Sequence, residues 1–274
     1  MPGSVFAISD LHSSHAANRR IIDDLRAESD DDWLIVAGDV GETFGDIADA
    51  LRLLRQRYAK VIWTPGNHDL WTLREDPVQL RGEARYQALV QMCKDNDILT
   101  PQDEFAIWTG PTGPTTIVPL FQLYDYSWLA PGTKTKTESL EYAYRTGVVC
   151  ADEMLLHSDP HPNRETWCDA RLKESEHRLF ALGPDVKTVL VSHWPLVRQP
   201  TDVLRFPEFA QWCGTTRTAD WHVRFRAEVA VYGHLHIRRT TQYDGVRFEE
   251  VSVGYPREWS TRGKPPMPKK VLPG

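Results

Sequence analysis

Short apolar runs recur along the chain and alternate with amphipathic segments. The first three runs cover residues 4–9, 33–37 and 60–64, a length typical of buried strands. Between them, residues 13–28 and 46–58 carry apolar side chains at helical spacing. This alternation predicts a parallel, right-handed α/β layer in the first 70 residues.

The same signals continue less regularly in the rest of the chain. They predict helices over residues 82–96 and 164–182 and strands over 105–108, 115–120, 187–191 and 229–232. The turn pair Asp244-Gly245 predicts a hairpin between runs 240–243 and 246–253. We expect one domain over residues 1–264, with insertions at 122–185 and 198–226 near the site forming a lid, and a poorly ordered tail over 265–274.

Polar side chains follow the carboxyl ends of the predicted strands, where open α/β sheets bind their ligands. One histidine in such a place is usually a satisfied loop residue, and Asn67-His68-Asp69 alone is equally consistent with a polar turn. Because such histidines follow several predicted strands, a metal site becomes the better interpretation. Imidazole and carboxylate together suit Mn, Fe and Zn. Two aspartates buried close together would also repel each other without a cation. The sequence therefore predicts a metal site from Asp10, His12, Asp39, Asn67, His68, His193, His234 and His236.

Composition and charge limit the classes of partner that we expect this protein to bind. The net charge of −6 argues against a nucleic-acid binder. Residues 214–274 nevertheless carry 11 Lys and Arg against 6 Asp and Glu, a balance of +5, which suits either an acidic partner or a solvated surface. The four cysteines form no CxxC pair, and no signal peptide is evident, so we expect a cytoplasmic protein. No apolar run approaches the ~20 residues of a membrane helix, so we expect no membrane partner.

The order and spacing of the polar motifs resemble the calcineurin-like metallophosphoesterases along nearly the whole chain. The matching motifs are Asp10-x-His12, Gly38-Asp39-x-x-Glu42, Gly66-Asn67-His68-Asp69, His193 and Gly233-His234-x-His236. The resemblance implies a two-sheet αββα sandwich. It also implies two divalent cations, Mn or Fe with Zn as an alternative, about 3.5–4 Å apart. The first would be held by Asp10, His12, Asp39 and His236, and the second by Asp39, Asn67, His193 and His234.

The resemblance further assigns His68 to the substrate and not to the metals. Glu42 occupies the place of the acidic residue that orients this histidine, and Asp69 is a competing partner. The implied reaction is in-line attack of water on phosphorus, with the cations spreading the charge of the transition state. As an imidazolium, His68 would stabilise that charge or protonate the leaving oxygen.

Local strings beyond the metal motifs resemble an actinobacterial subgroup of this family. They are Trp63-x-Pro65-Gly66-Asn67-His68, residues 212–216, residues 218–222 and residues 243–250. That subgroup removes 4′-phosphopantetheine from holo acyl carrier protein, which implies a phosphodiesterase that returns the carrier to its apo form. Carrier proteins are typically acidic, so docking candidates lie in the basic stretch: Arg217, Arg224, Arg238, Arg239 and Arg257.

Three other functions remain open at this point. A small-molecule or cyclic-nucleotide phosphodiesterase or phosphatase would use the same metals, and Tyr124, Trp128 or Trp212 would stack a base. A nuclease would share the chemistry, but the negative charge argues against it. A non-catalytic scaffold of this fold would lack the catalytic histidine or the metal ligands, and here both sets are present.

Overall fold

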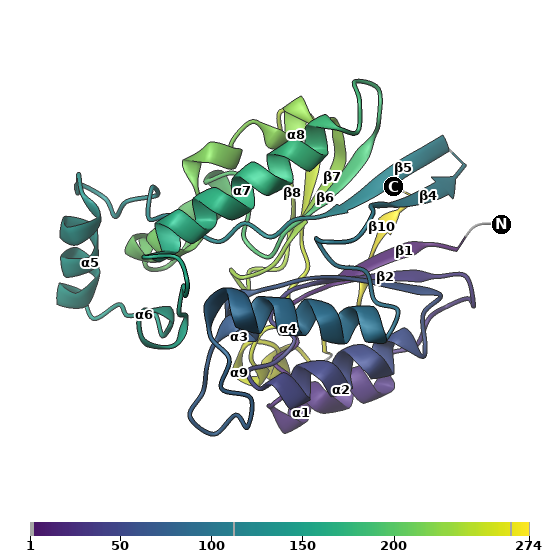
Figure 1. Ribbon diagram of the computed structural model, residues 1–274, viewed down its shortest axis with the longest axis horizontal. Coiled ribbons are helices and arrows are strands. Elements are labelled where there is room, and N and C mark those ends of the chain that lie inside the picture. Colours follow the sequence, from purple (N-terminus) through teal and green to yellow (C-terminus); the bar gives the residue numbers. More distant parts are fainter. Residues whose placement is uncertain (1–2, 112, 264, 274) are drawn as a thin grey trace.

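Two β-sheets pack face to face between outer layers of helices in the computed structural model (Figure 1). The strand orders are β10-β1-β2-β3 in the first sheet and β4-β5-β6-β7-β9-β8 in the second. The structure describes residues 3–111, 113–263 and 265–273, so the last residue of the predicted domain and of the predicted tail lie outside it. The predicted two-sheet αββα sandwich is confirmed.

The first sheet is the parallel layer that the apolar runs predict. Its parallel strands are β1 (Val5–Ile8), β2 (Trp33–Ala37) and β3 (Lys60–Thr64), with Val5 opposite Trp33 and Leu34 opposite Val61. The crossover helices α1 (Ala16–Asp24) and α2 (Phe44–Arg55), together with α4 (Gly82–Asp95), cover its outer face (Figure 1).

The second sheet has four parallel strands in its middle and an antiparallel strand at each edge. The parallel strands are β5 (Gly113–Pro119), β6 (Thr188–Val191), β7 (Ala227–Tyr232) and β9 (Val246–Glu250). The edges are β4 (Ala106–Gly110) and β8 (Thr240–Tyr243), and β8 forms the predicted hairpin with β9. Helices α7 (Arg164–Phe180) and α8 (Trp221–Arg224) cover the outer face (Figure 1).

Both faces of each central strand are buried, which explains the continuous apolar runs in the sequence. Val5 and Ala7 of β1 point toward the second sheet and pack in one core with Val189 and Val231. Phe6 and Ile8 point to the opposite face and belong to the core beneath the helices, because side chains alternate along a strand.

In the first insertion, helices α5 (Lys136–Arg145) and α6 (Asp152–Leu155) lie at the end of the molecule opposite the N-terminus (Figure 1). The second insertion contains the short 3₁₀ helices η1 (Gln199–Val203), η2 (Pro207–Trp212) and η3 (Thr216–Thr218). The predicted base-stacking role of the aromatic residues is wrong, because Tyr124, Trp128 and Trp212 are buried in the core.

The predicted disorder of the tail is wrong for residues 269–272. They form β10 (Lys269–Leu272), which pairs antiparallel with β1. Val271 and Leu272 bury their side chains in the core between the sheets, and this apolar contact holds a segment whose Pro/Lys-rich surroundings suggest a loop. Within the described ranges, no helix has both the length and the apolar character needed to cross a bilayer.

Candidate metal centre

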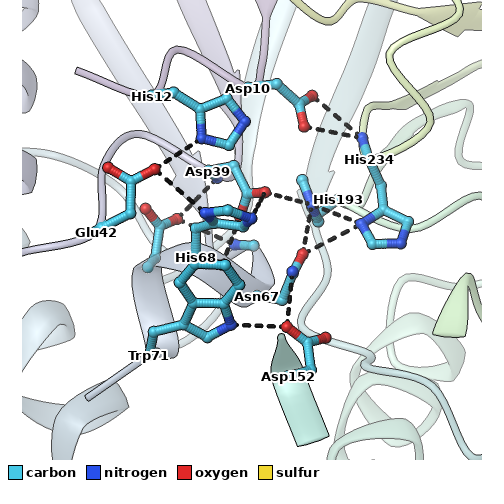
Figure 2. Close-up of polar contacts among 12 residues, drawn as sticks. Asp10, His12, Asp39, Glu42, Asn67, His68, Trp71, Asp152, His193 and His234 are labelled. Atoms are coloured by element: carbon cyan, nitrogen blue, oxygen red, sulfur yellow. Dashed lines mark hydrogen bonds and ion pairs between the residues drawn. The ribbon is translucent and has the colours of Figure 1, made fainter. Parts of the chain in front are cut away.

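The predicted metal ligands converge at one edge of the two sheets (Figure 2). Each follows one of five parallel strands, and the carboxyl ends of these strands meet at the same edge. The ligands come from the loops after β1, β2, β6 and β7 and from α3 (Asn67–Leu70), which follows β3. The seven residues are Asp10, His12, Asp39, Asn67, His193, His234 and His236.

One group of donor atoms forms around Asp10. The Nε2 atom of His236 lies 3.0 Å from Oδ1 of Asp10 and 3.4 Å from Nε2 of His12. Two ligands bound at right angles at about 2.1 Å from one cation are about 3 Å apart. These separations therefore fit a single ion held by all three side chains.

A second group forms around His193. Its Nε2 atom lies 3.2 Å from Oδ2 of Asp39, 3.1 Å from Oδ1 of Asn67 and 3.2 Å from Nδ1 of His234. The same Asn67 oxygen is 3.1 Å from Nδ1 of His234. Ligand atoms of Asp10, Asp39 and His193 also lie within 4.8 Å of one another, so Asp39 stands between the two groups.

In three of the candidate ligand histidines, a hydrogen bond on the side away from the centre fixes the tautomer. Each donates its Nδ1–H to an oxygen outside the centre, which leaves the Nε2 lone pair facing inward, as metal-binding histidines require. The acceptors are Oε1 of Glu42 for His12 at 2.9 Å, the carbonyl of Ala37 for His193 at 2.9 Å, and Oε2 of Glu258 for His236 at 2.8 Å. The residues present therefore fit a pair of divalent cations.

Backbone strain is concentrated at the same residues. Asp10, His12, Asp39, His234 and His236 all have positive φ, between 41° and 70°. A non-glycine residue in this region costs on the order of 1–3 kcal/mol and is typical of functional sites. Five strained candidate ligands in one cluster show that the fold maintains this geometry against local preference.

The buried carboxylates of Asp10 and Asp39 favour a positive charge beside them. Burial alone would raise the pKa of Asp39, but His193 and His68 hold it well below its ordinary value. Burial alone would lower the pKa of His193, but Asp39 and Asp10 raise it to about 9. Burial, together with His193, lowers the pKa of His234 to about 3. The two buried carboxylates thus favour a positive charge at this place, which a divalent cation would supply.

His68 lies beside the donor atoms on the face of Trp71, with ring centroids 3.5 Å apart (Figure 2). Its Nδ1 is 3.2 Å from Oε1 of Glu42, the same oxygen that holds His12. Its Nε2 faces the centre, 4.0 Å from Oδ2 of Asp39 and 3.4 Å from the hydroxyl of Tyr255. Burial alone would lower the pKa of His68, but Asp39 and Glu42 raise it above its ordinary value.

The partner of His68 is Glu42 and not Asp69. Asp69 instead accepts hydrogen bonds from the backbone N–H groups of Gly66 and Asp39, each at 3.0 Å, and of Val40 at 2.8 Å. It also accepts from the indole of Trp63 at 3.3 Å. Asp69 thus joins the loops after β2 and β3 and holds the backbone of the ligand Asp39 in place.

Sequence reasoning missed three residues that support the centre. Asp152 of α6 accepts from the Asn67 amide at 3.0 Å, Glu258 of α9 (Pro256–Trp259) holds His236, and Tyr255 stacks on the ring of His12 with centroids 4.5 Å apart. None belongs to a motif that distinguishes it from the other acidic and aromatic residues of the chain. Only the folded arrangement identifies them.

The centre forms the floor of a pocket of about 530 Å³. Both insertions contribute to its walls, through residues 149–151 and 204–206 and through Phe209, and Tyr255 and Arg257 close the opposite side. Of the five arginines considered for docking, only Arg257 lines this pocket. The others bind elsewhere: Arg217 to Asp169, Arg224 to Glu176, Arg238 to the carbonyl of Met267 and Arg239 to the carbonyl of Pro200.

Comparison with known proteins identifies the family to which this chain belongs. The family model described as calcineurin-like phosphoesterase matches residues 3–238, and the chain belongs to this family. The predicted family and enzyme class, a phosphoester hydrolase, are thereby confirmed.

One relative is similar to this chain in both sequence and structure. The chain is 54% identical over 270 residues to the [acyl-carrier-protein] phosphodiesterase PptH of Mycobacterium tuberculosis, covering 98% of this chain and 83% of that protein. It also matches the crystal structure of phosphopantetheinyl hydrolase (PptH) from Mycobacterium tuberculosis with a TM-score of 0.97 and 54% identity, covering 99% of this chain and 96% of that one.

Proposed function

We propose that the protein hydrolyses the phosphodiester between a carrier-protein serine and 4′-phosphopantetheine, converting holo acyl carrier protein to the apo form. The observation that carries the proposal is the 54% identity, over 98% of the chain, to a protein named as an acyl-carrier-protein phosphodiesterase. The candidate ligands cluster together, and four of them line one pocket with His68, which supports a catalytic protein and not a scaffold.

The proposed cofactors are two divalent cations, Mn or Fe, with Zn as the alternative. Asp10, His12, Asp39 and His236 would hold one, and Asp39, Asn67, His193 and His234 the other. When bound, such ions neutralise phosphoryl oxygens and lower the pKa of bound water. The mixed set of carboxylate, amide and imidazole ligands, without thiolates, favours these metals over softer ones.

The proposed roles of the chain's own groups follow from their positions. Water bonds to phosphorus as the bond from phosphorus to the serine Oγ breaks, so the serine oxygen must gain a proton. The Nε2 atom of His68 faces the centre, while Nδ1 is held by Glu42, so His68 is placed to donate that proton. Asp69 would act only by positioning the loops that carry Asp39 and Asn67.

The same proposal extends to the organisation of the chain. We take residues 1–264 and strand β10 as one domain in which the insertions 122–185 and 198–226 serve as the wall or lid of the active site. Both insertions line the pocket beside the metal ligands, which supports this role. A carrier protein as substrate also agrees with the proposed cytoplasmic location.

Mass spectrometry of holo carrier protein incubated with the enzyme and Mn²⁺ tests the function. Loss of the whole prosthetic arm, with 4′-phosphopantetheine as the released product, is the expected result, and the His68→Asn variant provides the control. An unchanged carrier mass together with cleavage of cyclic nucleotides or other small phosphoesters would replace the proposal by that alternative. Parallel reactions with Fe²⁺ and Zn²⁺, and metal analysis of the purified protein, would identify the ions.

A further inference from the structure

We propose that the mouth of the metal pocket is the docking surface for the acidic surface of the carrier protein around its modified serine. This inference deepens the proposed function and rests on it. We call the surface the carrier rim, and it consists of the exposed apolar side chains Val149 and Phe206 with Arg205 and Arg257, all of which line the pocket.

The chemistry of the scissile bond demands such a surface. In the proposed substrate, the phosphorus is attached directly to the serine Oγ, so only Cβ and Oγ separate it from the serine Cα. With bonds of about 1.5 Å, the carrier backbone must come within about 4 Å of the phosphorus. The phosphorus must itself reach ligands that lie at the floor of the pocket, where only 3% of the Asp39 side chain and 11% of the His68 side chain are exposed. The carrier therefore cannot react without resting on the residues around the mouth.

Two exposed apolar side chains lie at this mouth, Val149 at 68% exposure and Phe206 at 49%. The exposed side chains of Met154 (74%) and Val203 (50%) belong to the same two segments of the chain. They come from two distant segments that are fastened together, because the hydroxyl of Thr146 donates to Glu208 and the amide of Gln211 donates to the carbonyl of Ser139. Val149 and Phe206 also line the pocket. A cluster of exposed apolar groups next to a catalytic pocket is typical of a protein-binding surface.

Two arginines give this surface a positive charge. Arg205 and Arg257 are exposed, line the pocket, and lie over the rings of Phe206 and Tyr255 at 5.3 and 5.2 Å. Among the described residues neither forms an ion pair with a carboxylate. Asp202 is an exposed opposing charge on the same segment, and Glu258 is engaged by His236. In a chain of net charge −6, two unpaired guanidinium groups beside the catalytic centre complement an acidic partner.

The reaction geometry also sets the direction of the substrate. If His68 protonates the leaving serine oxygen, the serine lies on the His68 side of the pocket, which Tyr255 and Arg257 border. The pantetheine arm is neither the attacking nor the leaving group, so it leaves the phosphorus sideways, along the apolar wall formed by Leu204, Phe206 and Phe209. Arg257 would then contact the carrier close to the modified serine, and Arg205 would contact it farther along.

The test compares two substrates with the metal-loaded enzyme: holo carrier protein, and bis(4-nitrophenyl) phosphate, which has no protein part. For each variant we consider the ratio of kcat/KM on the carrier to kcat/KM on the small diester. We expect Arg257→Glu, Arg205→Glu and Val149→Asp each to lower this ratio by about tenfold or more, mainly through KM, with a larger effect at low salt. Arg20→Glu, the same charge reversal at an exposed position of helix α1, is the matched control and keeps the ratio of the wild type.

A second arm uses the partner. Replacing acidic residues near the modified serine of the carrier by lysine lowers its turnover by the wild type and restores turnover by Arg257→Glu. If the wild type releases 4′-phosphopantetheine but the ratio is unchanged in all three rim variants, the docking surface is wrong and the proposed function stands. If the wild type cleaves the small diester and leaves holo carrier intact, the proposed function fails and the docking surface with it.

Discussion

The side-chain amide of Asn67 donates from Nδ2 to Oδ1 of Asp152, 3.0 Å away, and this contact joins the metal centre to helix α6 (Figure 2). The same carboxylate accepts from the indole of Trp71 at 2.6 Å and from the hydroxyl of Tyr124 at 3.0 Å. With its NH₂ group held in this way, Asn67 must point its Oδ1 toward His193 and His234. The insertion thus positions Asn67, one of the proposed metal ligands.

Removing the carboxylate of Asp152 should therefore weaken metal binding. We expect Asp152→Ala to lower metal affinity by about 10–100-fold, because groups that orient a ligand typically have effects of this size. Asp152→Asn keeps an oxygen for Asn67 and an NH₂ for the Tyr124 hydroxyl, so its loss should be smaller. Calorimetric titration of the apo proteins with Mn²⁺ measures both. Equal affinity in wild type and a folded Asp152→Ala variant would contradict this role.

His68 and Glu42 should differ in what they affect. His68→Asn should lose about 10²–10⁴-fold in turnover, the usual contribution of a proton donor, and retain both metals. Glu42→Gln should lower both turnover and metal affinity, because Oε1 of Glu42 holds the Nδ1 atoms of His68 and His12 at once. Metal content and steady-state kinetics of the two variants separate these effects. A Glu42→Gln protein with normal metal affinity would show that His12 does not depend on this contact.

A buried ion pair between Arg85 and Asp76 supports the segments that contain Glu42 and Asp69. Arg85 and Asp76 are both inaccessible to solvent, with Nη1 and Oδ2 2.9 Å apart, and Arg85 also donates to the carbonyls of Asp69 and Glu42. Asp76→Ala would leave the guanidinium without its counter-charge and should lower the free energy of unfolding by about 3–5 kcal/mol. The control is Asp49→Ala, which removes an ion pair with Arg52 in which Asp49 is 65% exposed, and should cost less than about 1 kcal/mol. Urea unfolding of both variants checks the difference.

Glu153 should make stability depend on pH in the acid range. It accepts hydrogen bonds from Tyr126, Trp212 and Arg164 at 2.7, 2.8 and 3.1 Å. Burial alone would raise the pKa of Glu153, but these partners lower it below the ordinary value of 4.5. A carboxylate whose pKa is depressed on folding stabilises the protein fully above its unfolded pKa, and this stabilisation disappears as the pH falls through the folded pKa.

The measurement is the difference in unfolding free energy between wild type and Glu153→Gln as a function of pH. We expect a constant difference at pH values above 4.5 and a difference that shrinks steadily below it. A difference that stays the same down to the acid end of the folded range would mean that the ionised form of Glu153 adds nothing to stability.

The parts of this protein that the sequence predicted depend on local pattern. The runs 33–37 and 60–64 are strands because a fully buried strand needs apolar residues on both faces, and this composition is visible in the letters. The convergence of the candidate ligands was predictable for a related reason. Since these residues follow the ends of parallel strands, their distance in the chain does not obscure that they share one edge of the fold.

The sequence by itself determined the α/β architecture, the seven candidate ligands and the class of chemistry. The tertiary structure decided that Glu42 and not Asp69 holds His68, that Asp152 orients Asn67, and that residues 269–272 are a strand. It also separated Arg257, at the pocket, from arginines engaged elsewhere. These outcomes depend on contacts between residues far apart in the chain, 85 positions for Asn67 and Asp152, and no local periodicity encodes which distant side chain will occupy the neighbouring space.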